Sequence, residues 1–153
     1  MKSIADLLPA RDIILDLEVA NKDQLFDAIG RHMEATHGLP KEWVVLSLSR
    51  REQVGSTGLG EGVAIPHARI KDLLCMQLAY LRLKSPIPFG APDGKPVSDI
   101  LVLLVPKPAT EEHLAILAEA SRLFSDADFR ERLHQCGEPA AAKKLFAGWP
   151  VPA

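Results

Sequence analysis

Two kinds of hydrophobic spacing follow one another along the chain and predict its elements. Apolar residues alternate with polar ones, or run without interruption, in four segments typical of β-strands. These segments are residues 12–19, 62–66, 75–83 and 98–106. Because the last one is unbroken, it predicts a strand covered on both faces. Apolar residues recur every three or four positions in five further segments, which predicts helices at 21–38, 40–53, 109–125, 126–136 and 138–149.

Local signals support two of these helices. Asn21 has the side chain of an N-cap, and Gly38 is suited to end the same helix. In the 109–125 segment, we expect one buried face made of Leu114, Leu117, Ser121 and Phe124. The order is strand, two helices, three strands and three helices. It predicts a single α/β domain with a mixed β-sheet and helices on both faces, but it does not predict the order of the strands.

Composition excludes several classes of protein. The 153 residues include 18 basic and 20 acidic side chains, a net charge of −2 that gives no electrostatic footprint for nucleic acid. No apolar stretch approaches the roughly 20 residues of a membrane span, so no membrane insertion is expected. The N-terminus lacks the apolar core of a signal peptide, which favours the cytoplasm. The two cysteines lie far apart, so neither a disulfide framework nor a zinc site is expected from them.

A glycine-rich loop occupies residues 54–62, with Ser56 and Thr57 followed directly by Gly58. Glycines let backbone N–H groups approach an anion, and short hydroxyls add further donors. The segment lacks the lysine of a P-loop and follows a predicted helix, whereas the Rossmann glycines follow a strand. On the glycines alone, a simple connecting loop is the favoured interpretation.

His67 follows this loop, directly after a proline. Imidazole accepts a proton or a phosphoryl group near neutral pH, and Pro66 is expected to end the strand so that His67 lies at its exit. Taken alone, such a histidine is more often a structural turn residue. His113 favours a functional role for His67, because it also follows a predicted strand. It lies three residues after Thr110, a predicted N-cap. Two histidines after two strands of one sheet are expected to meet at its end.

Arg51 ends the helix that leads into the glycine loop, where its guanidinium is suited to bind phosphate oxygens. A solvated cation near a helix C-terminus is the simpler alternative. Together with the two histidines, it fits phosphoryl transfer through a histidine nucleophile. These residues fit a metal site poorly because carboxylates and cysteines at ligand spacing are missing among them. No GxSxG motif indicates a Ser-His-Asp triad.

The string RREQVGSTGLGEGVAIPHARI, residues 50–70, resembles the signature of fructose/mannitol-type IIA domains of the phosphoenolpyruvate-dependent phosphotransferase system. The segment LLVPKPATEEHLAILAEASRLF, residues 103–124, resembles the strand and helix that carry the second active-site histidine of that family. The likeness extends from Ile4 to Phe146. Within the family, residues 4–30 are most similar to nitrogen-regulatory IIA proteins. The resemblance implies an EIIA type-2 domain at residues 4–147 with the IIA mannitol/fructose fold. The proline-rich sequence of residues 148–153 predicts a loose tail. No fused IIB or IIC domain is expected within these 153 residues.

The resemblance assigns roles at the site. It implies that His67 is the phosphorylated nucleophile, that Arg51 helps to hold the phosphate and that His113 is the neighbouring histidine. Ser56, Thr57 and Gly58 form the phosphate loop, and no metal or cofactor is expected. Leu59, Val63 and Ile70 are candidates for an apolar docking patch, although each of these three side chains is equally suited to a core.

The resemblance also implies partners. The expected donor is a phosphocarrier of the HPr type, similar to NPr, and the expected role is mainly regulatory, acting on proteins such as transporters or sensor kinases. One alternative is a sugar-specific IIA component that passes phosphate to a IIB domain. Another is an interaction module that has lost the transfer activity, for which loss of the histidines would be expected.

Overall fold

The apolar run near residue 100 forms β6 (Val97–Pro106), the central strand of a six-stranded mixed sheet. The computed structural model describes residues 3–107 and 111–149. On one side of β6 lies β5 (Gln77–Ile87), which is antiparallel to it and pairs in turn with the parallel strand β1 (Ile13–Leu17). The mixed sheet that the sequence predicted is therefore confirmed.

The other side of β6 carries an interrupted edge. Both β3 (Val63–Ala64) and β4 (His67–Ile70) pair with β6 in parallel, one after the other, and β2 (Gly58–Gly60) pairs with β3. Pro66 separates the two pieces, but its carbonyl still accepts a hydrogen bond of 2.9 Å from Leu103 N. The expectation that Pro66 ends the strand ladder was wrong. A proline removes only its own N–H donor, and pairing resumes at His67.

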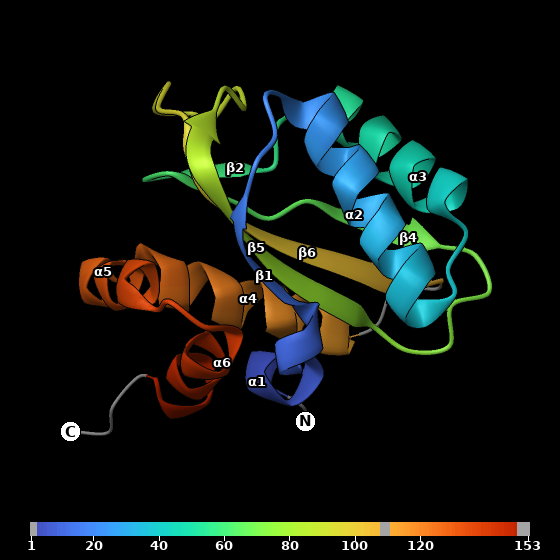
Figure 1. Cartoon of the computed structure of the whole chain (residues 1–153). Helices are drawn as coiled ribbons and strands as arrows, with labels where there is room; N and C mark the ends of the chain where they lie inside the picture. The colour runs from blue at the N-terminus through green and yellow to red at the C-terminus, as the bar shows by residue number, and fades with distance from the viewer. Residues whose placement is uncertain (1–2, 108–110, 150–153) are drawn as a thin grey trace.

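Two layers of helices cover the sheet (Figure 1). α2 (Lys22–His37) and α3 (Lys41–Val54) lie on one face, whereas α4 (Glu111–Ser125), α5 (Ala127–Gln135) and α6 (Pro139–Gly148) lie on the other, together with the short α1 (Ile4–Leu7). Among the described helices, none is long and apolar enough to cross a membrane.

Side-chain alternation along β6 divides the core between the layers. Leu101, Leu103 and Val105 pack with the α4–α6 layer, and Ile100 and Val102 pack with the α2–α3 layer. A strand buried on both faces has no polar side to display, which explains the unbroken apolar run.

The predicted caps of α2 are confirmed. Asn21 accepts a hydrogen bond of 2.9 Å from Gln24 N, and Gly38 adopts a left-handed conformation with φ of 69°. α1, β2, β4 and the 3-10 helix η1 (Ala10–Asp12) were not predicted, because elements of three or four residues are too short to show a period.

The register of α4 differs from the sequence prediction. Its buried residues are His113, Ile116, Ala120, Leu123 and Phe124, whereas Leu114 is 66% exposed and Ser121 is exposed. The two faces are adjacent on a helical wheel, and packing against the sheet selected the one that includes Ile116 and Leu123. The predicted N-cap Thr110 lies outside the described residues.

The predicted C-terminal tail begins inside ordered structure. Gly148 is the last residue of α6, and Trp149 donates a hydrogen bond of 3.2 Å from Nε1 to Asp126 Oδ2 and lies against the Phe129 ring. Residues 150–153 lie outside the described part, so the domain boundary at 147 stays a prediction.

Candidate active site

His67 is the first residue of the edge strand β4 and pairs with Leu103 of β6. Successive side chains of a strand point to opposite faces. Ala68 and Ile70 pack into the α2–α3 core, so His67 and Arg69 project toward the α4 side of the sheet. His67 is half-buried, and its Nδ1 lies 2.9 Å from the carbonyl oxygen of Ile65. Since a carbonyl only accepts, Nδ1 carries the proton and Nε2 carries the lone pair.

His113 lies in the first turn of α4, and its ring centroid is 6.2 Å from that of His67. The two histidines that the sequence predicted to meet are therefore neighbours. His113 is only 8% exposed, and within the described residues neither of its ring nitrogens has a hydrogen-bond partner. Burial, followed by the nearby His67 and Arg69, lowers the pKa of His113 below its ordinary value of 6.5. The His113 ring is therefore neutral at neutral pH.

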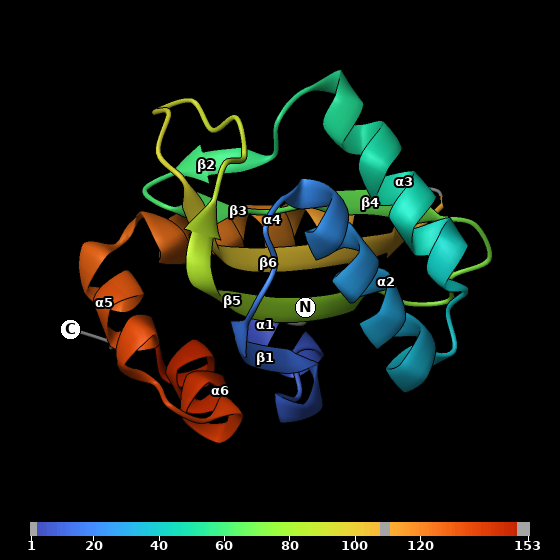
Figure 2. The same cartoon turned by 45° about the horizontal axis from the view of Figure 1, so that its top comes forward.

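A cavity of about 490 Å³ joins the two histidines to the third predicted residue, Arg51. Its lining residues come from the sheet edge, where α3 runs beside β4 and α4 lies behind it (Figure 2). The side chains that line it come from α3, β4, the end of β6 and α4. They are Ser47, Arg50, Arg51, His67, Ala68, Arg69, Val105, Lys107 and His113. Among these lining residues there is no carboxylate.

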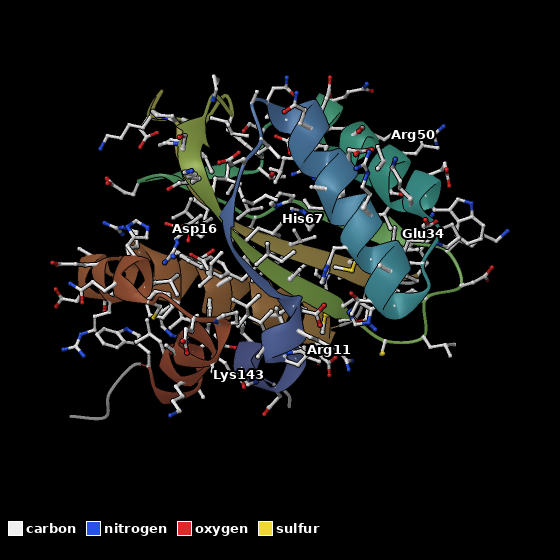
Figure 3. All side chains as sticks on the ribbon, viewed as in Figure 1. Arg11, Asp16, Glu34, Arg50, His67 and Lys143 are labelled. Carbon is white, nitrogen blue, oxygen red and sulfur yellow. The ribbon has the colours of Figure 1, made fainter. Side chains whose placement is uncertain are left out.

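Four cations surround the cavity. Arg51 is held at the end of α3 by a hydrogen bond of 2.9 Å from its Nη1 to the carbonyl oxygen of Gly55, which leaves its other donors available. Arg50 extends from the same helix and is labelled in Figure 3 with His67. Arg69 and Lys107 complete the set. Guanidinium and ammonium groups without a neighbouring carboxylate are suited to bind an anion such as phosphate.

Three of the four cations, Arg50, Arg69 and Lys107, were not predicted from the sequence to belong to the site. Arg69 had a usable signal, because residues two apart in a strand share a face and Arg69 is two residues after His67. That signal was missed because β4 was not predicted. Lys107 directly follows the last residue of β6. His113 was assigned to the site because it follows this same strand, so the same argument could have identified Lys107.

The three predicted loop residues do not line the cavity. Thr57 is buried, and both its N–H and its hydroxyl donate to the carboxylate of Glu52, at 3.0 and 2.7 Å. The Ser56 hydroxyl donates to the carbonyl oxygen of Phe89 at 2.9 Å and accepts from Gly58 N at 3.1 Å. These hydrogen bonds fix the shape of the loop. A contact of these residues with phosphate stays a prediction.

Gly58 is also required by packing. A Cβ built on it would lie 2.9 Å from Cβ of Ala91, closer than real Cβ atoms come. Of the three residues considered for a docking patch, Val63 and Ile70 belong to the core, and only Leu59 is exposed. An apolar patch made of these three residues is therefore excluded.

Comparison with known proteins gives consistent matches. The sequence model of a family described as phosphoenolpyruvate-dependent sugar phosphotransferase system, EIIA 2, matches residues 6–148. The nitrogen regulatory protein of Bradyrhizobium diazoefficiens is 33% identical over 144 residues, which are 94% of each chain. That of Pseudomonas aeruginosa is 47% identical over 87 residues, which span 57% of this chain and 56% of that protein.

A solved structure extends the match to the fold. The crystal structure of the nitrogen regulatory protein IIA-Ntr from Neisseria meningitidis is 41% identical in sequence and has a TM-score of 0.89. The match covers 94% of this chain and 98% of the Neisseria chain. The family match over nearly all of the chain and the shared fold lead to one conclusion: the chain belongs to the EIIA type-2 family of the phosphoenolpyruvate-dependent phosphotransferase system and is similar to its nitrogen regulatory members.

Proposed function

We propose that the chain is a phosphohistidine relay protein that accepts a phosphoryl group on Nε2 of His67 from an HPr-type phosphocarrier similar to NPr. One observation carries this proposal. The hydrogen bond between Nδ1 and the Ile65 carbonyl fixes the tautomer, so that Nε2 carries the lone pair of a ring that lines a cavity with four cations. A nucleophile needs a free lone pair, and the accepted phosphate needs compensating charge.

The transfer step is an in-line displacement at phosphorus. The Nε2 lone pair forms the new N–P bond while the N–P bond to the carrier histidine breaks, and the bonding electron pair leaves with the carrier imidazole. Nδ1–H keeps its hydrogen bond to Ile65 and stabilises the positive charge on the phosphorylated ring. Because the new bond is again an N–P bond, the group stays ready for a further transfer.

Arg51 and His113 bind the transferred group. The guanidinium of Arg51 offers donors in a fixed planar arrangement to the three phosphoryl oxygens. His113 is neutral, so one of its ring nitrogens carries a hydrogen that lacks a partner within the described residues. A phosphoryl oxygen supplies that partner, and the buried ring then no longer lacks a hydrogen bond. The Ser56–Gly58 loop holds the end of α3, and therefore Arg51, in place.

The main role of the relay is regulatory and belongs to the cytoplasm. The similarity to nitrogen regulatory proteins supports this role. Phosphorylation adds nearly two negative charges to a half-buried, cationic surface. Such a change alters which proteins bind there, and transporters and sensor kinases are the classes of target that we propose.

Phosphorylation of the purified chain tests the nucleophile. The protein is incubated with phosphoenolpyruvate, enzyme I and the phosphocarrier, and the modified residue is located by mass spectrometry in alkali, which preserves phosphohistidine. We expect label on His67, none in His67→Ala, and full labelling in His134→Ala, a histidine on α5 that does not line the cavity. Label on another residue would contradict the assignment.

A second transfer separates regulation from sugar transport. The phosphorylated chain is mixed with fructose-type and mannitol-type IIB domains, and the loss of its label is followed with time. A regulatory protein keeps its phosphate in this assay. Rapid transfer to either domain would replace the regulatory role with that of a sugar-specific IIA component.

A further inference from the structure

Three side chains converge at a second place in the fold. Asp12, the last residue of η1, is 1% exposed, and its Oδ1 lies 2.7 Å from Nε2 of His32 and 2.8 Å from Nε2 of His37. Both histidines come from α2, and their side chains are 12% and 9% exposed. Figure 3 labels Arg11 and Glu34, which mark the two elements involved, η1 and α2. None of the three converging residues lines the cavity around His67.

The donor atoms of this cluster are grouped like metal ligands. The two imidazole nitrogens and the carboxylate oxygen all lie within 4.8 Å of one another. In a tetrahedral zinc site the metal–ligand distances are about 2.0–2.2 Å, which separates neighbouring ligand atoms by about 3.3 Å. The present N–O distances of 2.7 and 2.8 Å need to open by only about half an ångström to reach that separation.

Hydrogen bonds alone pair the three side chains poorly. Both rings direct Nε2 at the same oxygen, so each must carry its proton on Nε2 and both protons approach one acceptor. A divalent ion in the centre of the three atoms replaces this crowding. Each ring then carries its proton on Nδ1 and binds the ion through the Nε2 lone pair.

The surroundings of His32 suit that change of tautomer. Its Nδ1 lies 3.5 Å from the hydroxyl oxygen of Thr36, one helical turn away. When Nδ1 carries the proton, it donates to this hydroxyl. Metal-bound histidines usually have such an outer partner, which fixes the ring orientation.

We propose that Asp12, His32 and His37 form a binding site for a zinc-like divalent transition-metal ion. Two imidazoles and one carboxylate favour zinc and its neighbours over magnesium and calcium, which take oxygen ligands. Three protein ligands leave the fourth position to water, which reaches the site through the partly exposed imidazoles. The site joins η1 to α2, so a bound ion stabilises the attachment of the N-terminal segment.

Titration of the apo protein with ZnCl₂ at about pH 7.5 tests the proposal; metal affinity depends on pH because protons compete with the ion for its ligands. Competition with a chromophoric chelator measures the stoichiometry and Kd, and circular dichroism measures Tm. We expect one equivalent to bind and Tm to rise with zinc concentration. Since loss of an outer partner alone weakens metal sites about tenfold to a hundredfold, His32→Gln and His37→Gln should bind more than about a hundredfold more weakly.

Two matched variants test whether zinc binds at histidines outside the cluster. His134→Gln and His67→Gln each remove one histidine outside the cluster, and both should bind zinc as the unmodified chain does. Equal loss of binding in His67→Gln, or unchanged binding in both cluster variants, would overturn the proposal.

If the His32 and His37 variants fail to fold, a measurement on the unmodified chain still tests the metal site. Nitrogen-15 NMR of the histidine rings reports the tautomer and the nitrogen that binds the metal. One equivalent of zinc should shift Nε2 of His32 and His37 and move their protons to Nδ1. Resonances of these two rings that stay unchanged after zinc has bound would contradict the site.

Discussion

Buried polar side chains in folded proteins nearly always have hydrogen-bond partners, and His113 has none among the described residues. Leaving such a group unpaired costs about 1–3 kcal/mol. We interpret this cost as part of the proposed site, because in the proposed function a phosphoryl oxygen supplies the missing hydrogen-bond partner. In His67, by contrast, Nδ1 is paired with the Ile65 carbonyl, and Nε2, which we propose as the nucleophile, has no hydrogen-bond partner in the part of the chain that the structure describes.

The lowered pKa of His113 predicts how stability depends on pH. Because the folded chain binds this proton less tightly than the unfolded chain, its contribution to stability is present above pH 6.5 and is lost as the pH falls through the lower folded pKa. His113→Gln keeps an N–H donor without a titrating group. The free energy of unfolding, measured by urea denaturation at about pH 7.5 and about pH 5.5, should fall less in His113→Gln than in the unmodified chain. Equal decreases would show that His113 does not titrate as proposed.

Replacement of Arg51 should affect the transfer rate rather than the fold. Removing one preorganised donor from a charged transition state costs about a hundredfold in rate, so Arg51→Gln should accept phosphate from the carrier about a hundredfold more slowly. Arg31→Gln is the matched control, since Arg31 lies on α2 with its side chain 72% exposed. The initial rate of label transfer measures both. A rate for Arg51→Gln equal to that of the control would exclude Arg51 from phosphate binding.

At the scale of elements, the glycine loop is held by specific hydrogen bonds. Glu52, near the end of α3, accepts from Thr57 and also pairs with Lys22 Nζ of α2 at 2.7 Å. Ser56 fastens the next residues to the β5–β6 connection through Phe89. The loop therefore sets the position at which α3 ends, and with it the position of Arg51. The sequence indicated the glycines and hydroxyls but could not show these partners, which lie up to 33 residues away.

Two glycines of this loop make a matched pair for a stability test. Gly58→Ala forces a methyl group against Ala91, and overpacking of this kind costs about 1–3 kcal/mol. Gly55→Ala meets no atom within 4 Å and has an extended backbone with φ of 168°. Urea denaturation should show a lower free energy of unfolding for Gly58→Ala and no loss for Gly55→Ala. Equal stability of the two variants would refute the packing role of Gly58.

At the scale of the whole molecule, a buried polar group links the sheet to the α4–α6 layer. Tyr80 donates a hydrogen bond of 2.5 Å to Asp99, and the other carboxylate oxygen of Asp99 lies 2.5 Å from Nε2 of His134 on α5. Arg82 donates to the last carbonyls of α5, including that of Leu133 at 3.1 Å. These contacts fix the orientation of α5 on the sheet, which apolar packing alone leaves less defined.

Loss of the Tyr80 hydroxyl should destabilise the whole domain. Burial raises the pKa of Tyr80 well above its ordinary value, so the phenol stays protonated and donates to Asp99. Tyr80→Phe leaves that carboxylate oxygen without its donor, which costs about 1–3 kcal/mol. Thermal and urea unfolding should both show the loss. Ser121→Ala, at an exposed position of α4, should change stability by less than about 0.5 kcal/mol. A Tyr80→Phe variant as stable as this control would contradict the linking role.

The pattern of apolar residues by itself determined the long elements. Burial of one face produces a period, whereas burial of both faces of a strand produces an unbroken apolar run. This pattern predicted α2, the central strand β6 and a mixed sheet with helices on both faces. The residue types Asn21 and Gly38 predicted the two caps of α2. Local chemistry together with a family resemblance singled out His67, His113 and Arg51, and the structure brings these three residues to one cavity.

Only the tertiary structure decided what depends on partners distant in the sequence. Strand order, the resumption of pairing at His67 and the buried face of α4 follow from packing against other elements, not from local pattern. By contrast, the nitrogen of His67 that we propose to be reactive follows from the carbonyl of Ile65, only two residues away, which the local backbone conformation places beside the ring. The cluster of Asp12, His32 and His37 appears only when η1 folds against α2, because twenty residues separate its carboxylate from the nearer imidazole.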